Sequence, residues 1–543
     1  NERRLMAQLQ FKGKTFVQNH HLLVKYHELI PVQAKSLTEK ISLHDSLIIH
    51  GDNLKALKSL LPMFAAKVDC IYIDPPYNTG NEGWIYNDNV NSPMMQEWLG
   101  KVVDREDLTR HDKWLCMMTP RLKLIRELMS EEGAIFISID DNEVQHLRML
   151  MDDIFGEENF VATIIWEKVY APKSSAKFFS ENHDYIVAYA KHKENFILGL
   201  LPRTQEADAR YENPDNDLRG PWKPSDLSAR NPYSKGIYSI TCPGGRTVNG
   251  PPPGNYWRYS EEKFRRLDAD NRIWWGADKN QVPAIKRFLT EVKQGLVPET
   301  IWTYKEVGHT QEAKKELLAV LGEDFQTFTT LKPTRLLERI LQVGTKDDSL
   351  VLDAFAGSGT TAHAVLKQNA EDGGSRRFIL IESEEYADSI TAERIRRAIS
   401  GVPAAKHEGL KNGLDGSFSY FEIGNPVELG HILDGHNLPK YGELARYVFY
   451  TATGEEFNEA AVDKEKNFIG ESRQYQVYMF YEPEVSKLKN LALTLEIANN
   501  LPPLCEGKRR LVFAPTKYLD QEHLDLYKID FAQLPFEIYE LAR

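Results

Sequence analysis

Short apolar runs alternate with amphipathic stretches in the first part of the chain. The runs SLIIH (46–50) and VDCIYI (68–73) flank the helical pattern LKALKSLLPMF, and a helix over roughly 117–130 precedes the run AIFISI (134–139). Another helical pattern follows Asp140 and Asp141. Strands that alternate with helices are typical of a parallel sheet with helices on both faces. The sequence therefore predicts an α/β fold.

This alternation is interrupted and later resumes. FVATIIW (160–166) and DYIVAYA (184–190) have no long helix between them, which predicts an antiparallel pair at the sheet edge. Between 192 and 330, clusters of Pro, Gly, Asn and Asp with interleaved aromatic residues replace the pattern. It returns with SLVLDAF (349–355) and RFILIE (377–382), and a loose linker then precedes a second, smaller α/β pattern.

The changes in pattern divide the chain into five segments. We expect an N-terminal helical segment (1–45), the first part of the α/β domain (46–191), an inserted domain (192–330), the second part of the α/β domain (331–400) and a C-terminal α/β domain (401–543).

Composition narrows the class of protein. The 543 residues are 42% hydrophobic and 27% charged, which excludes disordered, collagenous and coiled-coil proteins. No apolar run approaches the ~20 residues that span a bilayer, and the first twenty residues hold no secretory signal, so we expect a soluble intracellular protein. The four cysteines lack CxxC spacing, so neither a metal site nor a disulfide framework is expected.

Charge is distributed unevenly along the chain. The net charge is −12, but residues 221–300 carry 13 Lys and Arg against 8 Asp and Glu, whereas residues 401–543 carry 15 against 22. A basic middle can face nucleic acid, and an acidic C-terminal region is expected to face away from phosphates.

The tetrapeptide Asp74-Pro75-Pro76-Tyr77 is the most specific motif. It follows a predicted strand, and two prolines exclude a helix or a central strand, so they indicate a rigid turn at the strand's carboxyl end. The alternative is a plain turn in which Asp74 is a cap.

A second strand-to-helix turn runs from Asp353 to Thr361. Its glycines allow a ligand to approach the backbone at a helix N-terminus. It lacks the lysine of a P-loop and does not spell GxGxxG, which disfavours those two sites. Glu382, at the end of the next strand, stands where an acidic residue often binds ribose hydroxyls, and a solvated strand end is the alternative.

With these motifs the chain resembles the β-class amino-DNA methyltransferases, and most closely the Mod subunits of type III restriction-modification systems. The resemblance covers roughly 1–190 and 305–390. It is carried by FKGKTFVQNHHLL, HGDNLKAL, YIDPPYNTGNEGWIYND, FISIDDNE, FSENHDYIVAYAK, GHTQEAKKEL, LKPTRLL and LDAFAGSGTTAHAVL. As in that family, the glycine turn comes after the DPPY turn, with a recognition segment between them.

The resemblance implies a Rossmann-like class I S-adenosylmethionine-dependent methyltransferase fold in circularly permuted order, with a target recognition domain inserted at 192–330. It implies methyl transfer to the N6 amine of a flipped adenine in double-stranded DNA. The amine would be bound by Asp74 and Pro75, and Tyr77 would stack on the base, within a catalytic turn that includes Pro76. The implied residues for S-adenosylmethionine are Asp52, Asn53, Lys332, Pro333, Asp353, Phe355, Gly357, Ser358, Gly359, Thr360, Thr361 and Glu382.

The resemblance also implies partners and a location. These are double-stranded DNA, a second copy of the chain joined through residues 401–543, a possible separate restriction (Res) subunit and the bacterial cytoplasm, with no membrane. In the basic middle, tryptophans mix with arginines, which fits a DNA-reading surface or, alternatively, an ordinary small core with a solvated face. The arginines expected to bind DNA are Arg230, Arg246, Arg258, Arg265 and Arg272.

Two other functions stay open. An N4-cytosine methyltransferase more often carries Ser at the position of Asp74, and a non-catalytic DNA-binding specificity subunit would retain a decayed cofactor pocket. Asp141 has its own pair of interpretations, a helix N-cap or a residue that lines the pocket.

Overall fold

The structure, a computed structural model, describes residues 9–79, 110–172, 174–292, 295–322, 331–403, 408–427, 438–488 and 490–534. The stretch 80–88, which carries part of the family resemblance, lies outside these ranges. Two compact units make up the chain, the first from Asn1–Leu198 with Glu299–Arg543 and the second, here called the inserted unit, from Gly199–Pro298. The inserted unit is shorter than the expected range 192–330.

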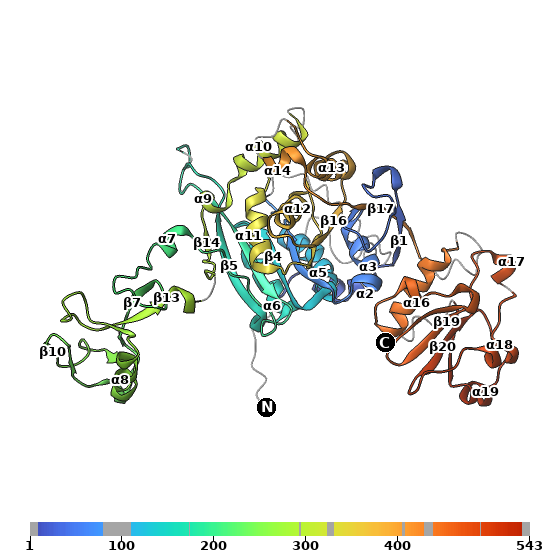
Figure 1. The fold of residues 1–543 in the computed structure, drawn as a ribbon. Helices are drawn as coiled ribbons and strands as arrows, with labels where there is room; N and C mark the ends of the chain where they lie inside the picture. The colour runs from blue at the N-terminus through green and yellow to red at the C-terminus, as the bar shows by residue number, and fades with distance from the viewer. Residues whose placement is uncertain are drawn as a thin grey trace. The chain divides into compact units, whose positions relative to one another are not determined.

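A mixed ten-stranded sheet organises the first unit (Figure 1). Its strand order is β1-β17-β2-β16-β15-β3-β4-β6-β5-β14. The strands are β1 (His27–Pro31), β2 (Leu47–His50), β3 (Val68–Ile73), β4 (Met129–Ile139), β5 (Phe160–Glu167), β6 (His183–Ala190), β14 (Ile301–Trp302), β15 (Leu350–Asp353), β16 (Arg377–Glu382) and β17 (Ser419–Pro426). Strands β2, β16, β15, β3 and β4 are parallel, as the continuous apolar runs predict.

The strands that carry the two motifs are direct neighbours. In the β15–β3 pair, Val351 lies opposite Cys70 and Leu352 opposite Ile71. From β3 the chain continues to β4 on one side, and from β15 it continues to β16 on the other. Ligands of open α/β sheets bind beyond the carboxyl ends of the strands at such a reversal of order. The predicted α/β fold is therefore confirmed, with Asp74 and Asp353 at the expected place.

Both edges of the sheet hold strands that the sequence pattern did not indicate. The predicted antiparallel pair is β5 with β6, but β14 pairs with β5 beyond it. At the other edge, β17 pairs with β2, and β1 pairs antiparallel with β17. The N-terminal segment is thus not only helical, because the partner that makes HELIP a strand comes from far along the chain.

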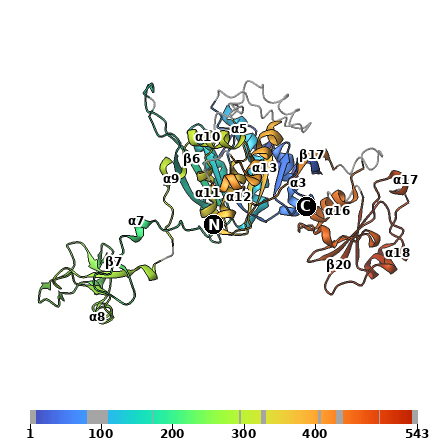
Figure 2. The ribbon, with the colours of Figure 1, turned by 45° about the horizontal axis from the view of Figure 1, so that its top comes forward.

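Helices cover both faces of the sheet. Because parallel crossovers are right-handed, connections that run in opposite directions along the sheet place their helices on opposite faces. One layer holds α3 (Asn53–Phe64), α5 (Arg110–Leu128) and α6 (Val144–Phe155), and the other holds α11 (Thr334–Gly344), α12 (Thr360–Asp372) and α13 (Glu393–Ser400). Figure 2 shows the second layer in front of the strands. No helix within the described ranges is long and apolar enough to cross a membrane.

Before the C-terminal region, the first unit contains further helices besides these six. They are α1 (Lys14–Val17), α2 (His20–Leu23), α9 (Tyr304–Val307), α10 (Thr310–Leu321) and α14 (Glu408–Asn412). Since α9 and α10 belong to the first unit, the inserted unit ends at Pro298 and not at the expected residue 330.

The C-terminal region forms a small α/β module after β17. Its four-stranded sheet has the order β18 (Phe468–Glu471), β19 (Tyr475–Met479), β20 (Arg509–Ala514) and β21 (Ile529–Gln533). Its helices are α16 (Tyr441–Thr453), α17 (Val485–Leu488), α18 (Leu495–Asn500) and α19 (Gln521–Leu526). Helix α16 packs on α3, and the amide of Phe457 donates to the carbonyl of Pro62 at 2.9 Å.

The inserted unit is built from short antiparallel strands. A three-stranded sheet joins β12 (Ile273–Trp274), β13 (Ala284–Phe288) and β7 (Trp222–Asp226). Two two-stranded pairs join β8 (Ser228–Ala229) with β11 (Tyr256–Trp257) and β9 (Ile240–Thr241) with β10 (Thr247–Val248), and the helices are α7 (Gln205–Asp208) and α8 (Glu261–Ala269). Its core holds Leu227, Ile240, Trp257, Phe264, Ile273 and Ile285.

Candidate active site

The turn after β3 is fixed by the helix that follows it. Pro75 and Pro76 end the strand, since proline cannot donate to a sheet ladder. The buried indole of Trp114 on α5 donates from Nε1 to the carbonyl oxygen of Pro76 at 2.7 Å. A buried side chain thus holds the backbone of the DPPY turn.

Asp74 uses one carboxylate oxygen and leaves the other unpaired. Its Oδ2 lies 2.5 Å from Nζ of Lys332, while Oδ1 is buried without a hydrogen-bond partner in the described part of the chain. Burial and then the charge of Asp74 raise the pKa of Tyr77 well above its usual value. The Tyr77 hydroxyl is near enough to feel this charge but is not in hydrogen-bonding geometry. Oδ1 is therefore an acceptor placed for a donor from a ligand.

Lys332 lies among the residues of this turn. Its ammonium is 5.1 Å from the ring centroid of Tyr77 and 5.9 Å from that of Trp166, within the range of cation–π interactions. The resemblance implied that Lys332 and Pro333 bind S-adenosylmethionine. The structure places Lys332 on Asp74, and Pro333 precedes the first residue of α11.

Asp353 ends β15 as a buried carboxyl group that supports the second turn. It accepts hydrogen bonds from the amide of Phe355 at 3.0 Å and from Oγ1 of Thr361 at 2.5 Å. Burial raises the pKa of Asp353 to about 7. The group can thus become charged when a cation binds nearby.

The glycine turn leaves free space at its centre. Gly357 has φ +51°, and no atom lies within 4 Å of the place where a Cβ would stand. Gly359 has φ +76°, but a Cβ there would meet the carbonyl oxygen of Thr391 at 3.1 Å. Gly357 therefore faces open space that a ligand can occupy, whereas Gly359 is needed for packing and for its left-handed backbone.

Glu382 is joined to the same turn. The side chain is 2% exposed, which rules out a solvated strand end, and burial raises its pKa to about 7. Its Oε2 accepts from the amide of Gly357 at 2.7 Å, and its Oε1 accepts from the amide of Glu384 at 3.0 Å.

The residues after β2 link the turns to one another. Asp52 caps α3 by accepting from the amide of Lys55 at 3.0 Å. Asn53 donates from Nδ2 to the carbonyl of Ala354 at 2.9 Å and accepts from Nε of Arg121 at 2.7 Å. One end of the Asn53 amide thus holds the backbone of the glycine turn, and Arg121 on α5 fixes the other end.

Known proteins are similar to this chain in sequence. The DNA methylase family matches residues 68–393, from the first residue of β3 to the first residue of α13. The chain belongs to this family. The StyLTI Mod subunit, from a type III restriction-modification enzyme of Salmonella typhimurium, is 33% identical over 476 residues, which cover 81% of this chain and 71% of that protein. The EcoPI Mod subunit of Escherichia phage P1 is 34% identical, over 63% of this chain and 58% of that protein. Among solved structures, the cytosine-N4-specific PvuII DNA methyltransferase is 12% identical, covers 64% of this chain and 86% of its own, and has a TM-score of 0.33.

Two hydroxyl groups of the methylase's glycine turn are bound by a buried arginine. Arg394 on α13 donates from Nη1 to Oγ of Ser358 at 3.0 Å and to Oγ1 of Thr360 at 2.8 Å. Burial lowers the pKa of Arg394 to about 10. The sequence analysis missed this residue, although ERIRRAIS places it on the same helical face as the apolar Ile395 and Ala398.

The five arginines expected to bind DNA differ in their surroundings. Arg230, Arg246, Arg258 and Arg265 are exposed on the inserted unit. Arg265 pairs with Glu261 at 2.6 Å, and the less exposed Arg272 pairs with Asp270 at 2.7 Å and with Glu291 at 2.6 Å. Trp222 and Trp257 are buried, so they support the core of the unit. The DNA-binding roles stay predictions for the exposed arginines, and Arg272 is the weakest candidate.

One expectation next to the site is wrong. Asp141 does not cap α6, because that helix begins only at Val144 after a turn. Its Oδ1 accepts from the hydroxyl of Tyr185 at 2.9 Å. The turn between β4 and α6 instead buries Glu143 at the position before the helix.

Proposed function

We propose that this methylase transfers a methyl group from S-adenosylmethionine to the N6 amine of an adenine that is flipped out of double-stranded DNA. One observation carries the proposal. The DPPY turn, with its unpaired carboxylate oxygen, and the glycine turn, with its open space, follow two neighbouring parallel strands at the reversal of the sheet. Methyl donor and acceptor can meet there.

The residues around Gly357 fit S-adenosylmethionine. The open space before the glycine admits a ligand, and the carboxyl groups of Asp353 and Glu382 favour one that carries positive charge. When bound, this cofactor supplies a methyl group whose bond to sulfur breaks as the bond to N6 forms. We assign Asp353, Phe355 and Gly357 to its methionine part and Glu382 to its ribose. Asn53, Ser358, Thr360 and Thr361 act by holding the turn.

The DPPY turn acts on the amine. The lone pair of an exocyclic adenine amine is conjugated with the ring, so the amine is a poor nucleophile. Hydrogen bonds from this amine to Oδ1 of Asp74 and to the carbonyl of Pro75 direct the lone pair toward the methyl group. Lys332 engages only Oδ2, which leaves Oδ1 for this role.

The inserted unit and the C-terminal module have separate roles in this proposal. The basic inserted unit contacts DNA and selects the site, so binding weakens steeply with salt as phosphate contacts release counterions. The acidic C-terminal module joins two copies of the chain. A separate restriction subunit is a further partner, since the relatives are named as Mod subunits of restriction-modification enzymes. The bacterial cytoplasm is the compartment that suits these partners.

Replacing Asp74 tests the chemistry. Asp74→Ala should lower methyl transfer by at least about 10²-fold and leave the affinities for DNA and cofactor nearly unchanged. Asp69→Ala is the matched control, because Asp69 lies on the same strand and accepts from Ser130 at 2.9 Å away from the turn. Transfer by Asp74→Ala at the wild-type rate would refute the assignment. If DNA with cytosine at the target position accepts no methyl group, the N4-cytosine alternative is excluded. If the wild-type protein shows no turnover, a non-catalytic subunit is favoured.

Replacing Tyr77 tests base flipping. The ring offers a stacking surface worth about 1–3 kcal/mol, which offsets part of the cost of extrusion. Tyr77→Phe should be mild, because the hydroxyl makes no hydrogen bond in the described residues. Tyr77→Ala should lower transfer more than DNA binding, and 2-aminopurine at the target should brighten when the wild-type protein binds. Normal methylation by Tyr77→Ala would exclude the stacking role.

A further inference from the structure

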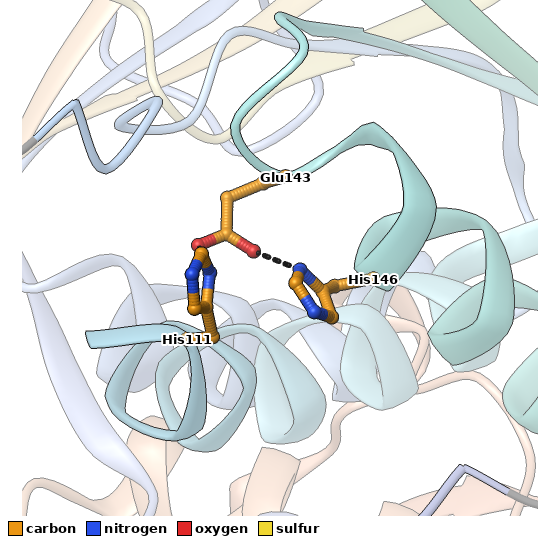
Figure 3. A group of neighbouring side chains, drawn as sticks. All are labelled: His111, Glu143 and His146. Atoms are coloured by element: carbon orange, nitrogen blue, oxygen red, sulfur yellow. Dashed lines mark hydrogen bonds and ion pairs between the residues drawn. The ribbon is translucent and has the colours of Figure 1, made fainter. Parts of the chain in front are cut away.

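A buried carboxylate stands beside the DPPY turn, outside the residues so far given a role. Glu143 precedes α6 and its side chain is fully buried. Its Oε1 lies 2.7 Å from Nδ1 of His111, and its Oε2 lies 2.8 Å from Nδ1 of His146 (Figure 3). The three side chains come from two helices and the turn between β4 and α6.

The same carboxylate binds the residue that follows Tyr77. Asn78 is 2% exposed and has φ +57°, a left-handed backbone that asparagine adopts more readily than most residues. Its Nδ2 donates to Oε1 of Glu143 and, at 3.1 Å, to the carbonyl of Arg110. The end of the catalytic turn is therefore tied to both helices.

Both oxygens of the buried Glu143 carboxylate have hydrogen-bond partners. Burying a carboxylate is costly unless it is paired and hydrogen-bonded. In the described part of the chain, His111 and His146 are the basic side chains that contact this carboxylate, and no lysine or arginine pairs with it. The two imidazoles and the Asn78 amide thus satisfy both oxygens of the carboxylate.

We propose that Glu143 is a positioning residue for methyl transfer. Through Asn78 it fixes the left-handed backbone after Tyr77, and so the direction of the Tyr77 ring and of the Asp74 carboxylate. The inference rests on the proposed function of the DPPY turn. A misplacement of reacting groups by about 1 Å can cost on the order of 10² in rate. Loss of the hydrogen bond between Asn78 and Glu143 should therefore lower turnover and leave the binding of cofactor and DNA unchanged.

The same three residues could also ligate a metal ion, since one ligand atom from each lies within 4.8 Å of the others. In the structure both Nδ1 atoms point at the carboxylate oxygens at hydrogen-bond distance. We therefore commit to the hydrogen-bonded arrangement, and a metal site is an outcome that the test can return.

Two substitutions of Glu143 separate these possibilities. Glu143→Ala removes every acceptor and should lower kcat by about 10- to 100-fold, with the Kd for S-adenosylmethionine within about twofold of wild type. Glu143→Gln can still accept from Asn78 and His111 and can donate to His146 in its other tautomer. It should keep kcat within about threefold of wild type.

Substitution of Asn78 tests the donor of the same hydrogen bond. Asn78→Gly keeps the left-handed backbone but removes the side-chain hydrogen bonds, so kcat should fall as in Glu143→Ala. Asn467→Gly is the matched control, because Asn467 has φ +53° in the C-terminal module, and its kcat should be unchanged. The control separates the lost hydrogen bonds from any effect of adding a glycine.

The outcomes are distinct. Wild-type kcat in both Glu143→Ala and Asn78→Gly, in a preparation where Asp74→Ala is inactive, overturns the inference and leaves the proposed function intact. One equivalent of zinc per wild-type chain by elemental analysis, lost equally in Glu143→Ala and Glu143→Gln with equal loss of kcat, also overturns it in favour of a metal site. If the wild-type protein itself transfers no methyl group, the proposed function has failed.

Discussion

Nζ of Lys332 lies 2.5 Å from Oδ2 of Asp74, although the two residues stand in opposite halves of the divided domain. The pair joins the segment before α11 to the turn after β3. Because Lys332 is only 7% exposed, its charge is held next to the carboxylate rather than shared with solvent. This contact places Lys332 at the DPPY turn, whereas the family resemblance implied a contact with the cofactor.

Lys332→Met should lower kcat by about tenfold and change the Kd for S-adenosylmethionine little, because the carboxylate loses the partner that orients it. Isothermal titration and single-turnover kinetics measure the two quantities. Lys367→Met is the control, since Lys367 pairs with Glu338 at 2.7 Å away from the turns. A weaker Kd with unchanged kcat would instead place Lys332 on the cofactor.

Gly357→Ala should fold and lose affinity for S-adenosylmethionine. The added Cβ meets no protein atom within 4 Å, so it would fill space that the ligand needs. Gly373→Ala is a matched control, because Gly373 also has a left-handed backbone and open surroundings, but it ends α12 away from the site. Both changes introduce backbone strain of about 1 kcal/mol, so thermal unfolding should shift similarly while only Gly357→Ala weakens the cofactor. Equal cofactor affinities in the two variants would exclude a cofactor in the open space at Gly357.

Cofactor binding should release protons near pH 6.5. Burial raises the pKa of both Asp353 and Glu382 to about 7, so the ligand-free groups are largely protonated below that pH. A positively charged ligand favours their ionised forms, and its affinity should therefore increase as pH rises toward 7 and level off above it.

The same shifts act on stability with the opposite sign. The unfolded carboxyl groups ionise near pH 4, so the stability contributed by burying them neutral is present below pH 4 and lost as pH rises to about 7.

The proton release on cofactor binding can be measured by titration calorimetry in two buffers of different ionisation heat. Asp353→Asn should release fewer protons, and an unchanged count would show that Asp353 does not titrate on binding.

The boundary of the C-terminal module can be tested by truncation. A chain that ends after residue 427 keeps β17 in the central sheet, whereas a chain that ends near 405 loses it and exposes the edge of β2. If the module mediates self-association, the first truncation should give a monomer by sedimentation and the second an insoluble chain. A dimer in the chain ending at 427 would place the interface elsewhere.

The parts of the fold predicted from sequence are those that depend on local patterns. Buried parallel strands are continuous apolar runs, and polar residues such as Asp74 and Asp353 mark their carboxyl ends, the edge of the sheet where ligands are expected. The pairing of β1 with β17 could not be predicted in this way, because it joins segments that lie far apart in the sequence.

The residues that hold the two turns in place also depend on contacts between segments far apart in the sequence. Arg394 reaches Ser358 and Thr360 from another helix, and Glu143 meets Asn78 across a turn. A single sequence shows the residue types at such positions but not which of them meet. The two motif turns could therefore be located from the sequence, whereas the residues that hold these turns could not.

The adjacency of β3 and β15 has a consequence for how the protein can be divided. A break in the backbone within the inserted unit, between residues 199 and 298, would leave one polypeptide with Asp74 and another with Asp353. Neither piece would hold both turns, yet each would retain one strand of a buried parallel pair. When they are co-expressed from two genes, such pieces should reassemble by pairing β3 with β15 and restore methyl transfer that neither piece shows alone.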